Sequence, residues 1–214
     1  MKNKFEILGL IITGFALLTQ FYLIIENRQA SITETITRFF SFFTVLTNTL
    51  VALFFITIIF KLKQGPFKIL SNQTALTAIT TFILIVSLVY QFALRGIWQP
   101  TGMQYLIDEL LHSIVPLYVL IYWLFTLDKS ALELKPVFTW LLYPMFYLLF
   151  VFTRGYFSGF YPYPFLNIPE IGLINTLQNI LVIIGVTAIL FSIMLFIGKI
   201  IISKRTVSIH QEEN

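Results

Sequence analysis

A threonine and a histidine are the side chains of this sequence whose types best suit catalysis. The chain contains two histidines, and only His112 lies within an apolar segment. Histidine is the side chain whose ordinary pKa suits proton transfer near neutral pH. A threonine hydroxyl becomes a nucleophile when such a base takes its proton, and Thr44 is the best-placed hydroxyl. A pair of this kind would transfer an acyl group by attacking a carbonyl carbon.

Spacing along two apolar segments predicts that these residues lie at similar depth in a membrane. Thr44 follows Arg38 by six residues, and His112 follows Tyr105 by seven. At a helical rise of about 1.5 Å per residue, these separations are about 9 Å and about 10 Å. Both segments start from the same side, so the two residues would be close if their helices are neighbours. Thr47 lies one turn further on, and the spacing leaves open whether Thr44 or Thr47 is the nucleophile.

A purely structural interpretation of both residues is also available. Buried threonines often donate to a carbonyl of their own helix, which needs no catalytic role. A histidine can simply join two helices by a hydrogen bond. On spacing alone, this interpretation is the stronger one.

Other polar side chains are predicted to lie near the pair and support it. Asp108 comes one helical turn before His112 and could orient the imidazole. An oxyanion needs a hydrogen-bond donor, and the planar guanidinium of arginine suits carboxylates and carbonyls. The candidate donors are Asn48, Tyr90 and Gln91, and the candidate arginines are Arg38, Arg95 and Arg154. Alternatively, these arginines pair with acidic residues of the same side, namely Glu26, Glu34, Asp108, Glu109 and Glu170.

Two local features are expected in the helices that carry the pair. Pro116 removes the hydrogen bond to the carbonyl of His112, which predicts a bend at the histidine. On the other helix, residues at helical spacing predict one continuous polar stripe, formed by Thr37, Ser41, Thr44 and Asn48.

Metal and cofactor chemistry is not predicted. The sequence has no cysteine, which excludes disulfides, thiolate nucleophiles and zinc–thiolate sites. Glu109 and His112 have the Glu-x-x-His spacing of di-iron bundles, but such sites need a second copy and two further glutamates. A haem with two axial histidines would need His210, which lies in the polar C-terminal segment.

The elements that position these residues are predicted to be transmembrane helices. The composition is 57% hydrophobic and 11% charged, whereas a soluble domain is about one-quarter charged. A span needs about 20 mostly apolar residues. The predicted fold is all-α: one integral membrane bundle of six transmembrane helices over residues 1–202, with a polar cytoplasmic tail at 203–214. The predicted spans cover about 5–25, 38–60, 74–94, 105–126, 136–153 and 171–202.

Basic residues predict the orientation of the bundle. Of the 14 Lys and Arg residues, four fall on the side opposite the N-terminus, and all four are arginines: Arg28, Arg38, Arg95 and Arg154. The other ten are Lys2, Lys4, Lys61, Lys63, Lys68, Lys129, Lys135, Lys199, Lys204 and Arg205. Short loops rich in Lys and Arg stay in the cytoplasm, so both termini are predicted there and the polar cluster in the outer half. This topology explains the net charge of +4 without nucleic acid, and membrane lipids are the expected partners.

Five segments of the sequence are distinctive: Arg95-Gly96-Ile97-Trp98-Gln99-Pro100-Thr101-Gly102, Leu111-His112-Ser113-Ile114-Val115-Pro116, Tyr122-Trp123, Arg154-Gly155 and Tyr161-Pro162-Tyr163-Pro164-Phe165-Leu166. Over nearly the whole chain they resemble six-helix bacterial membrane proteins related to the androgen-induced-gene family. The resemblance implies a multi-pass protein of the bacterial cytoplasmic membrane.

The animal members of that family are intramembrane hydrolases of fatty acid esters of hydroxy fatty acids. They use a threonine on an early helix and a histidine on a later one. The resemblance places that threonine at Thr44, within Phe42-Phe43-Thr44-Val45-Leu46-Thr47-Asn48, and the histidine at His112. It thereby implies a threonine-dependent hydrolase whose ligand is a lipid ester or fatty acid.

Two hypotheses follow for the function. In the first, Thr44 attacks a lipid ester after His112 takes its proton. In the second, the protein is a non-enzymatic lipid-binding, sensing or transport protein whose outer pocket holds a lipid without turnover. Contact between Thr44 and His112 would favour the first hypothesis.

Overall fold

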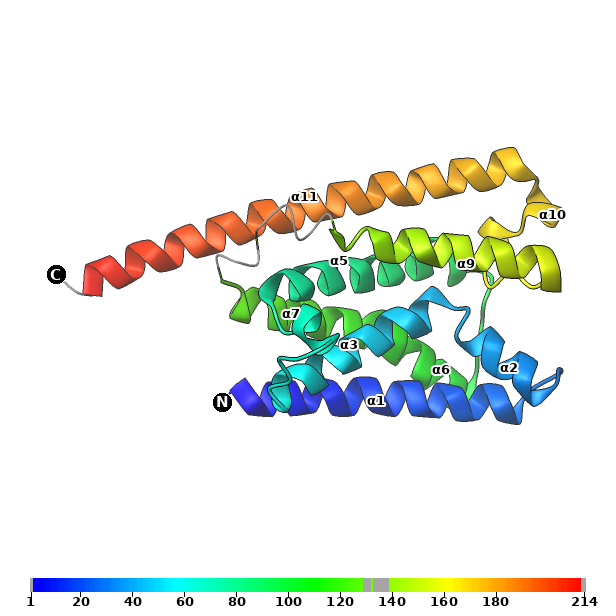
Figure 1. The fold of residues 1–214 in the computed structure, drawn as a ribbon, viewed down its shortest axis with the longest axis horizontal. Helices are drawn as coiled ribbons and strands as arrows, with labels where there is room; N and C mark the ends of the chain where they lie inside the picture. Colours follow the sequence, from blue (N-terminus) through cyan, green and yellow to red (C-terminus); the bar gives the residue numbers. More distant parts are fainter. Residues whose placement is uncertain (1, 129–131, 133–138, 213–214) are drawn as a thin grey trace.

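The computed structural model describes the backbone of residues 2–128, 132 and 139–212, which form helices and connecting loops with no strand among them (Figure 1). The long helices run along one axis, and α1 begins at the same end of the bundle at which α11 ends (Figure 1). These helices are α1 (Lys2–Glu26), α3 (Phe43–Ile59), α5 (Gln73–Val89), α7 (Val115–Thr126), α9 (Leu142–Ser158) and α11 (Leu173–Glu212).

Shorter elements connect the long helices. Two of them are π-helical turns: η1 (Tyr90–Leu94) continues α5, and η2 (Leu110–Ile114) joins α6 to α7. Ser31 caps α2 by accepting from the Glu34 backbone N–H, which supplies one of the hydrogen bonds that a helix start lacks. The remaining elements are α2 (Ile32–Phe39), α4 (Phe67–Leu70), α6 (Gly102–Glu109), the 3₁₀ turn η4 (Pro164–Leu166) and α10 (Ile168–Ile171).

The core lies where α3, α5 and α7 meet. Phe55, Ile79 and Trp123, one from each helix, have no exposed surface. The Trp123 indole N–H donates to Thr77 Oγ1 at 2.9 Å, so the one polar atom of this side chain is satisfied within the core. The site described below lies at one end of this core.

Apolar side chains remain exposed on the outside of the bundle, as expected of a helical membrane protein. Leu18 on α1, Leu149 on α9 and Leu181 on α11 are each exposed over more than 60% of their surface. Exposed apolar area is unfavourable in water but matches lipid chains. Among the described residues, four helices are long and apolar enough to span a membrane: Lys4–Glu26, Gln73–Leu94, Gly102–Thr126 and Leu173–Arg205. The bent pair α2 and α3 is a fifth if it is one span.

The predicted continuous helix over 38–60 is wrong, because α2 and α3 meet at 70°. Phe42 has extended backbone torsions (φ −81°, ψ 124°) between the two helices. Aromatic contacts hold the bend: Phe39 packs edge-on against Phe21 of α1, and Phe42 packs edge-on against Tyr163. The predicted polar stripe is therefore broken. Thr37 lies on α2, Ser41 lies in the bend, and Thr44 and Asn48 lie on α3. The estimate of about 9 Å between Arg38 and Thr44 assumed one straight helix, so it fails for the same reason.

The last two long helices differ from their predicted bounds. α9 runs from Leu142 to Ser158 rather than over 136–153, and residues 136–138 lie outside the described residues. Pro144 consequently lies in the first turn, where a missing N–H breaks no helical hydrogen bond. Gly159 ends α9 at φ 70°, a left-handed conformation that glycine adopts without strain.

α11 does not end at 202 as predicted but continues to Glu212. Residues 213–214 of the predicted tail lie outside the described residues.

Two glycines of α1 provide a matched test of the packing against α3 and α7. A Cβ at Gly9 would lie 2.6 Å from the Phe55 ring and 2.8 Å from the Tyr118 ring, whereas a Cβ at Gly14 would meet nothing within 4 Å. We expect Gly9→Ala to lower the free energy of unfolding by about 1–3 kcal/mol through overpacking. Gly14→Ala should be neutral or stabilising by up to about 1 kcal/mol. Thermal unfolding of the purified variants measures both, and equal effects would contradict the packing described.

Candidate active site

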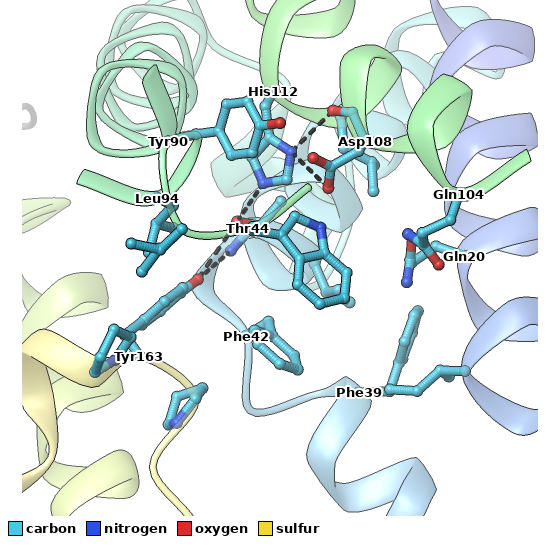
Figure 2. Close-up of a pocket in the computed structure, with 17 residues that line it drawn as sticks. Gln20, Phe39, Phe42, Thr44, Tyr90, Leu94, Gln104, Asp108, His112 and Tyr163 are labelled. Atoms are coloured by element: carbon cyan, nitrogen blue, oxygen red, sulfur yellow. Dashed lines mark hydrogen bonds and ion pairs between the residues drawn. The ribbon is translucent and has the colours of Figure 1, made fainter. Parts of the chain in front are cut away.

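Thr44 and His112 contact each other in the interior of the bundle. Thr44 Oγ1 lies 3.3 Å from His112 Nε2, and both residues are buried (Figure 2). Thr44 is in the first turn of α3, immediately after the bend, and His112 is in the π turn η2. The bend therefore brings the start of α3 to the histidine.

The histidine lies where two π turns meet. In η1 the Arg95 N–H bonds to the Tyr90 carbonyl, and in η2 the Val115 N–H bonds to the Leu110 carbonyl, each five residues back. The π turn η2 ends two residues before Pro116, whose missing N–H leaves the His112 carbonyl without its regular helical partner. The predicted bend at His112 is not among the helix breaks of the described residues, since Gly102–Thr126 forms one apolar helix that contains this π turn. Single π turns are frequent at functional sites. Here they place the Tyr90 ring flat on the His112 ring, with centroids 4.1 Å apart and an angle of 14° between the planes.

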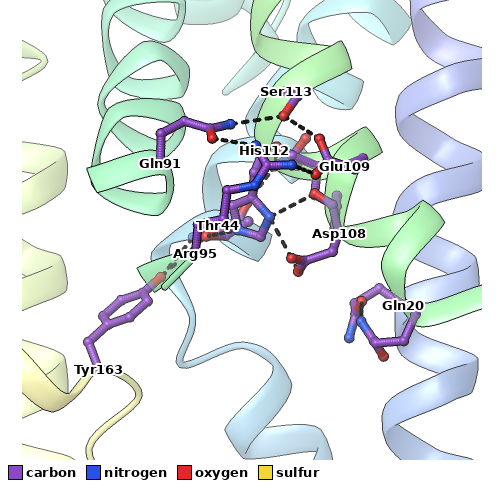
Figure 3. A network of polar contacts seen from close by, with 12 residues as sticks. Gln20, Thr44, Gln91, Arg95, Asp108, Glu109, His112, Ser113 and Tyr163 are labelled. Carbon is purple, nitrogen blue, oxygen red and sulfur yellow. Dashed lines mark hydrogen bonds and ion pairs between the residues drawn. The ribbon is translucent and has the colours of Figure 1, made fainter. Parts of the chain in front are cut away.

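A network of polar side chains fixes the two π turns to each other. Gln91 Nε2 donates to Ser113 Oγ at 3.0 Å, and Ser113 Oγ donates to Glu109 Oε2 at 2.8 Å (Figure 3). Arg95 completes the network by pairing with Glu109 and donating to Gln91 Oε1. The network thereby holds η1 against η2 and keeps Tyr90 stacked on His112.

Asp108 sets the orientation of the imidazole. His112 Nδ1 lies 2.8 Å from the Asp108 carbonyl oxygen and 3.4 Å from Asp108 Oδ1. Because a carbonyl oxygen only accepts hydrogen bonds, Nδ1 carries the hydrogen. In the tautomer whose hydrogen is on Nδ1 alone, the ring presents the lone pair of Nε2 to the Thr44 hydroxyl. In this arrangement Thr44 donates and His112 accepts, which is the direction that a general base requires.

Tyr163 is a third polar residue at the site, and the sequence reasoning did not assign it a role. Its hydroxyl accepts from the Thr44 backbone N–H at 3.3 Å and lies 3.4 Å from Thr44 Oγ1. Burial raises the pKa of the Tyr163 phenol, so its O–H remains a donor at neutral pH. Since the Thr44 hydrogen points to His112, the Tyr163 O–H is the donor to Thr44 Oγ1. The one sequence signal was the Tyr-Pro-Tyr-Pro-Phe segment that the family resemblance singled out.

The loop after α9 holds Tyr163 in place. The Tyr163 ring stacks on the Phe165 ring, with centroids 5.1 Å apart. Asn179 of α11 donates to the Phe165 carbonyl at 3.1 Å. Arg154 of α9 donates to the Phe160 carbonyl at 3.3 Å. These contacts tie the loop to α9 and α11 and so fix the phenol beside Thr44.

The predicted oxyanion donors are differently placed. Asn48 Nδ2 donates to the carbonyls of Thr44 at 2.9 Å and Leu111 at 3.3 Å, which uses both of its hydrogens. Gln91 donates to Ser113 within the network, and Tyr90 stacks on the imidazole. Asn48 and Gln91 therefore donate to other partners, whereas the Tyr163 O–H is next to the Thr44 hydroxyl.

Thr44 and Thr47, the two candidate nucleophiles, have different hydrogen-bond partners. Thr47 Oγ1 is bonded to the Tyr143 hydroxyl of α9 at 2.9 Å. Thr44 Oγ1 is the one that meets His112. Thr47 has no exposed surface and serves the contact between α3 and α9.

The three predicted arginines pair with acidic residues, as the structural alternative expected. Arg38 and Arg154 each lie 2.7 Å from Glu34 Oε1, which ties α2 to α9. Arg95 pairs with Glu109 in the network described above. Each of these guanidinium groups therefore has a glutamate partner.

A cavity of about 360 Å³ opens beside the pair. Thr44, Asp108, His112 and Tyr163 contribute its polar wall, together with Gln20 and Gln104, whose side-chain amides bond to each other at 2.8 Å. Tyr90 and Trp98 also line it, and the rest of its lining is apolar. Among the described residues, no three His, Cys, Asp or Glu side chains gather as metal ligands would.

Comparison of the chain with protein-family models, curated proteins and solved structures finds no match. The fold and the site therefore define the class: an all-helical bundle with apolar helices long enough to span a membrane and a buried threonine–histidine pair.

The position of the imidazole hydrogen is directly testable. We expect ¹⁵N NMR of histidine-labelled protein to show the His112 ring protonated at Nδ1, because the Asp108 carbonyl accepts from that nitrogen. The variant His210→Ala removes the other histidine signal and identifies the resonance. A neutral ring protonated at Nε2 would contradict the base geometry described here.

Proposed function

We propose that this protein is an intramembrane hydrolase that cleaves lipid carboxylic esters, with Thr44 as nucleophile and His112 as general base. The contact between Thr44 Oγ1 and His112 Nε2, with Nδ1 held by Asp108, carries this proposal. Nucleophile, base and orienting group in this order form the arrangement that activates a hydroxyl for acyl transfer on many unrelated folds.

The proposed reaction has two steps. Thr44 Oγ attacks the ester carbonyl while its proton passes to His112 Nε2. The carbon–oxygen bond to the alcohol then breaks, and Nε2 returns the proton to the leaving oxygen. Water attacks the acyl-threonine, gives a proton to Nε2, and expels the Thr44 oxygen, which takes that proton back. Acid, alcohol and free enzyme result.

The substrates to test first are fatty acid esters of hydroxy fatty acids. The resemblance to the androgen-induced-gene family suggests this class, and the apolar lining of the cavity suits alkyl chains. The arginines that were predicted to bind a carboxylate are paired with glutamates, so the proposal assigns them no contact with substrate.

We further propose that the bundle spans the cytoplasmic membrane of a bacterium six times, with both termini in the cytoplasm. α9 has 17 residues and would be the shortest span. The loop with Lys61, Lys63 and Lys68 lies at the same end as the start of α1 (Figure 1), which supports this orientation by the positive-inside rule. Lys129 and Lys135, which were also counted on the side of the N-terminus, lie outside the residues that the structure describes. The site would then be in the outer half of the membrane.

Hydrolysis by threonine variants tests the nucleophile. In lipid nanodiscs, we expect Thr44→Ala and His112→Ala each to lower ester hydrolysis by at least about a hundredfold, because each removes one member of the proton-transfer pair. Thr47→Val is the matched control on the same helix and should keep most of the activity. Wild-type rates in Thr44→Ala would exclude Thr44 as nucleophile. A wild-type protein that retains bound lipid but hydrolyses no ester would support the lipid-binding alternative.

Tyr163 is proposed to donate to the oxyanion that forms on the carbonyl oxygen. Its O–H is next to Thr44 Oγ1 and needs only to turn to the new oxygen. We expect Tyr163→Phe to lower kcat by about 10² to 10³ with little change in KM, as for loss of one oxyanion donor. Tyr161→Phe in the same loop is the control. An unchanged kcat in a stably folded Tyr163→Phe protein would refute this role.

A further inference from the structure

A second cavity, of about 630 Å³, shares part of its wall with the first. Thr44, Leu94 and Tyr163 line both cavities. The second cavity extends between α5, α9 and α11, which lie side by side in the bundle (Figure 1). Its α11 wall runs from Ile180 to Leu195, about 22 Å at about 1.5 Å per residue.

The side chains that line the second cavity are mostly apolar, and the hydroxyls of three polar ones are already hydrogen-bonded. Thr187 and Ser192 of α11 donate to carbonyls of their own helix at 2.7 Å and 2.8 Å. Tyr147 of α9 donates to the Ser41 carbonyl at 3.1 Å. These hydroxyls have no hydrogen left to donate to a ligand, so apart from the Thr44 end the cavity suits an alkyl chain.

His112 distinguishes the two cavities. It lines the first cavity, with Asp108, Gln20 and Gln104, and is absent from the lining of the second. In the proposed reaction the leaving alcohol must receive its proton from His112 Nε2, and the attacking water must give a proton to the same nitrogen. Alcohol and water therefore belong in the first cavity. The acyl group stays bonded to Thr44 and must extend away from them.

We propose that the two cavities are separate subsites: the cavity between α5, α9 and α11 binds the acyl chain of the ester, and the cavity at His112 binds the alcohol portion and admits water. This assignment rests on the proposed ester hydrolysis, and it makes α11 the determinant of acyl-chain length. Ala188 lies partway along the α11 wall, where a larger side chain would shorten the space beyond Thr44.

Acyl-chain selectivity tests the assignment. Wild type, Ala188→Phe and Ile189→Phe are compared on esters of one alcohol with saturated acyl chains of increasing length. Ile189 is 62% exposed and does not line the cavity, so it is the matched control. We expect Ala188→Phe to lower kcat/KM for long chains at least tenfold relative to short chains, with the control unchanged. The wild-type chain-length profile in folded Ala188→Phe would overturn the assignment.

Photo-cross-linking tests the subsite without requiring turnover. A saturated fatty acid with a diazirine at its chain end is bound to wild type and to Thr44→Ala, and labelled peptides are mapped by mass spectrometry. Label on α5, α9 or α11 is expected, and label confined to α1 or α6, which line the first cavity, would overturn the assignment. If label maps to α11 but no ester is hydrolysed, the proposed function fails while the alkyl-chain subsite stands.

Discussion

The hydrogen bond between His112 Nδ1 and the Asp108 carbonyl is the contact on which the rest of the site depends. It decides which nitrogen holds the hydrogen and therefore which one faces Thr44. The two residues are four positions apart in the chain, so the orientation of the imidazole ring is set within one helical turn and not by distant residues. Reversal of the ring tautomer would turn Nε2 into a donor and leave the Thr44 hydroxyl without an acceptor at His112.

The surroundings of this contact explain how polar groups are held within an apolar bundle. Burying a polar atom is costly unless it is hydrogen-bonded, and lipid offers no partners. The π turns on the helices of Tyr90 and His112 shift the backbone pattern, and side-chain bonds of Gln91, Ser113 and Glu109 lock the two turns together. The bend before α3 brings Thr44 to the same place. Departures from regular helix thus gather where the polar side chains meet.

The sequence predicted the helical class and named Thr44, Asp108 and His112, because apolar runs, proline position and four-residue spacing are local properties. It placed Thr44 and His112 at similar depth along straight helices, with the two helices assumed to be neighbours, whereas the structure reaches their contact through the 70° bend before α3. The bend depends on aromatic packing against α1 and the loop of Tyr163, which no local pattern encodes. Tyr163 itself is 119 residues from Thr44 and is positioned by contacts from Arg154 and Asn179. Both interpretations of the arginines were compatible with the sequence, since pairing depends on how neighbouring helices are placed.

Labelling with a fluorophosphonate probe is the most direct test of the central claim that His112 activates the Thr44 hydroxyl. The probe reacts with an activated hydroxyl and leaves a stable adduct that mass spectrometry can assign to one residue. We expect a single adduct on Thr44 in the wild-type protein and none in His112→Ala. An adduct on Thr47 or Tyr163, or undiminished labelling of Thr44 without the histidine, would contradict it.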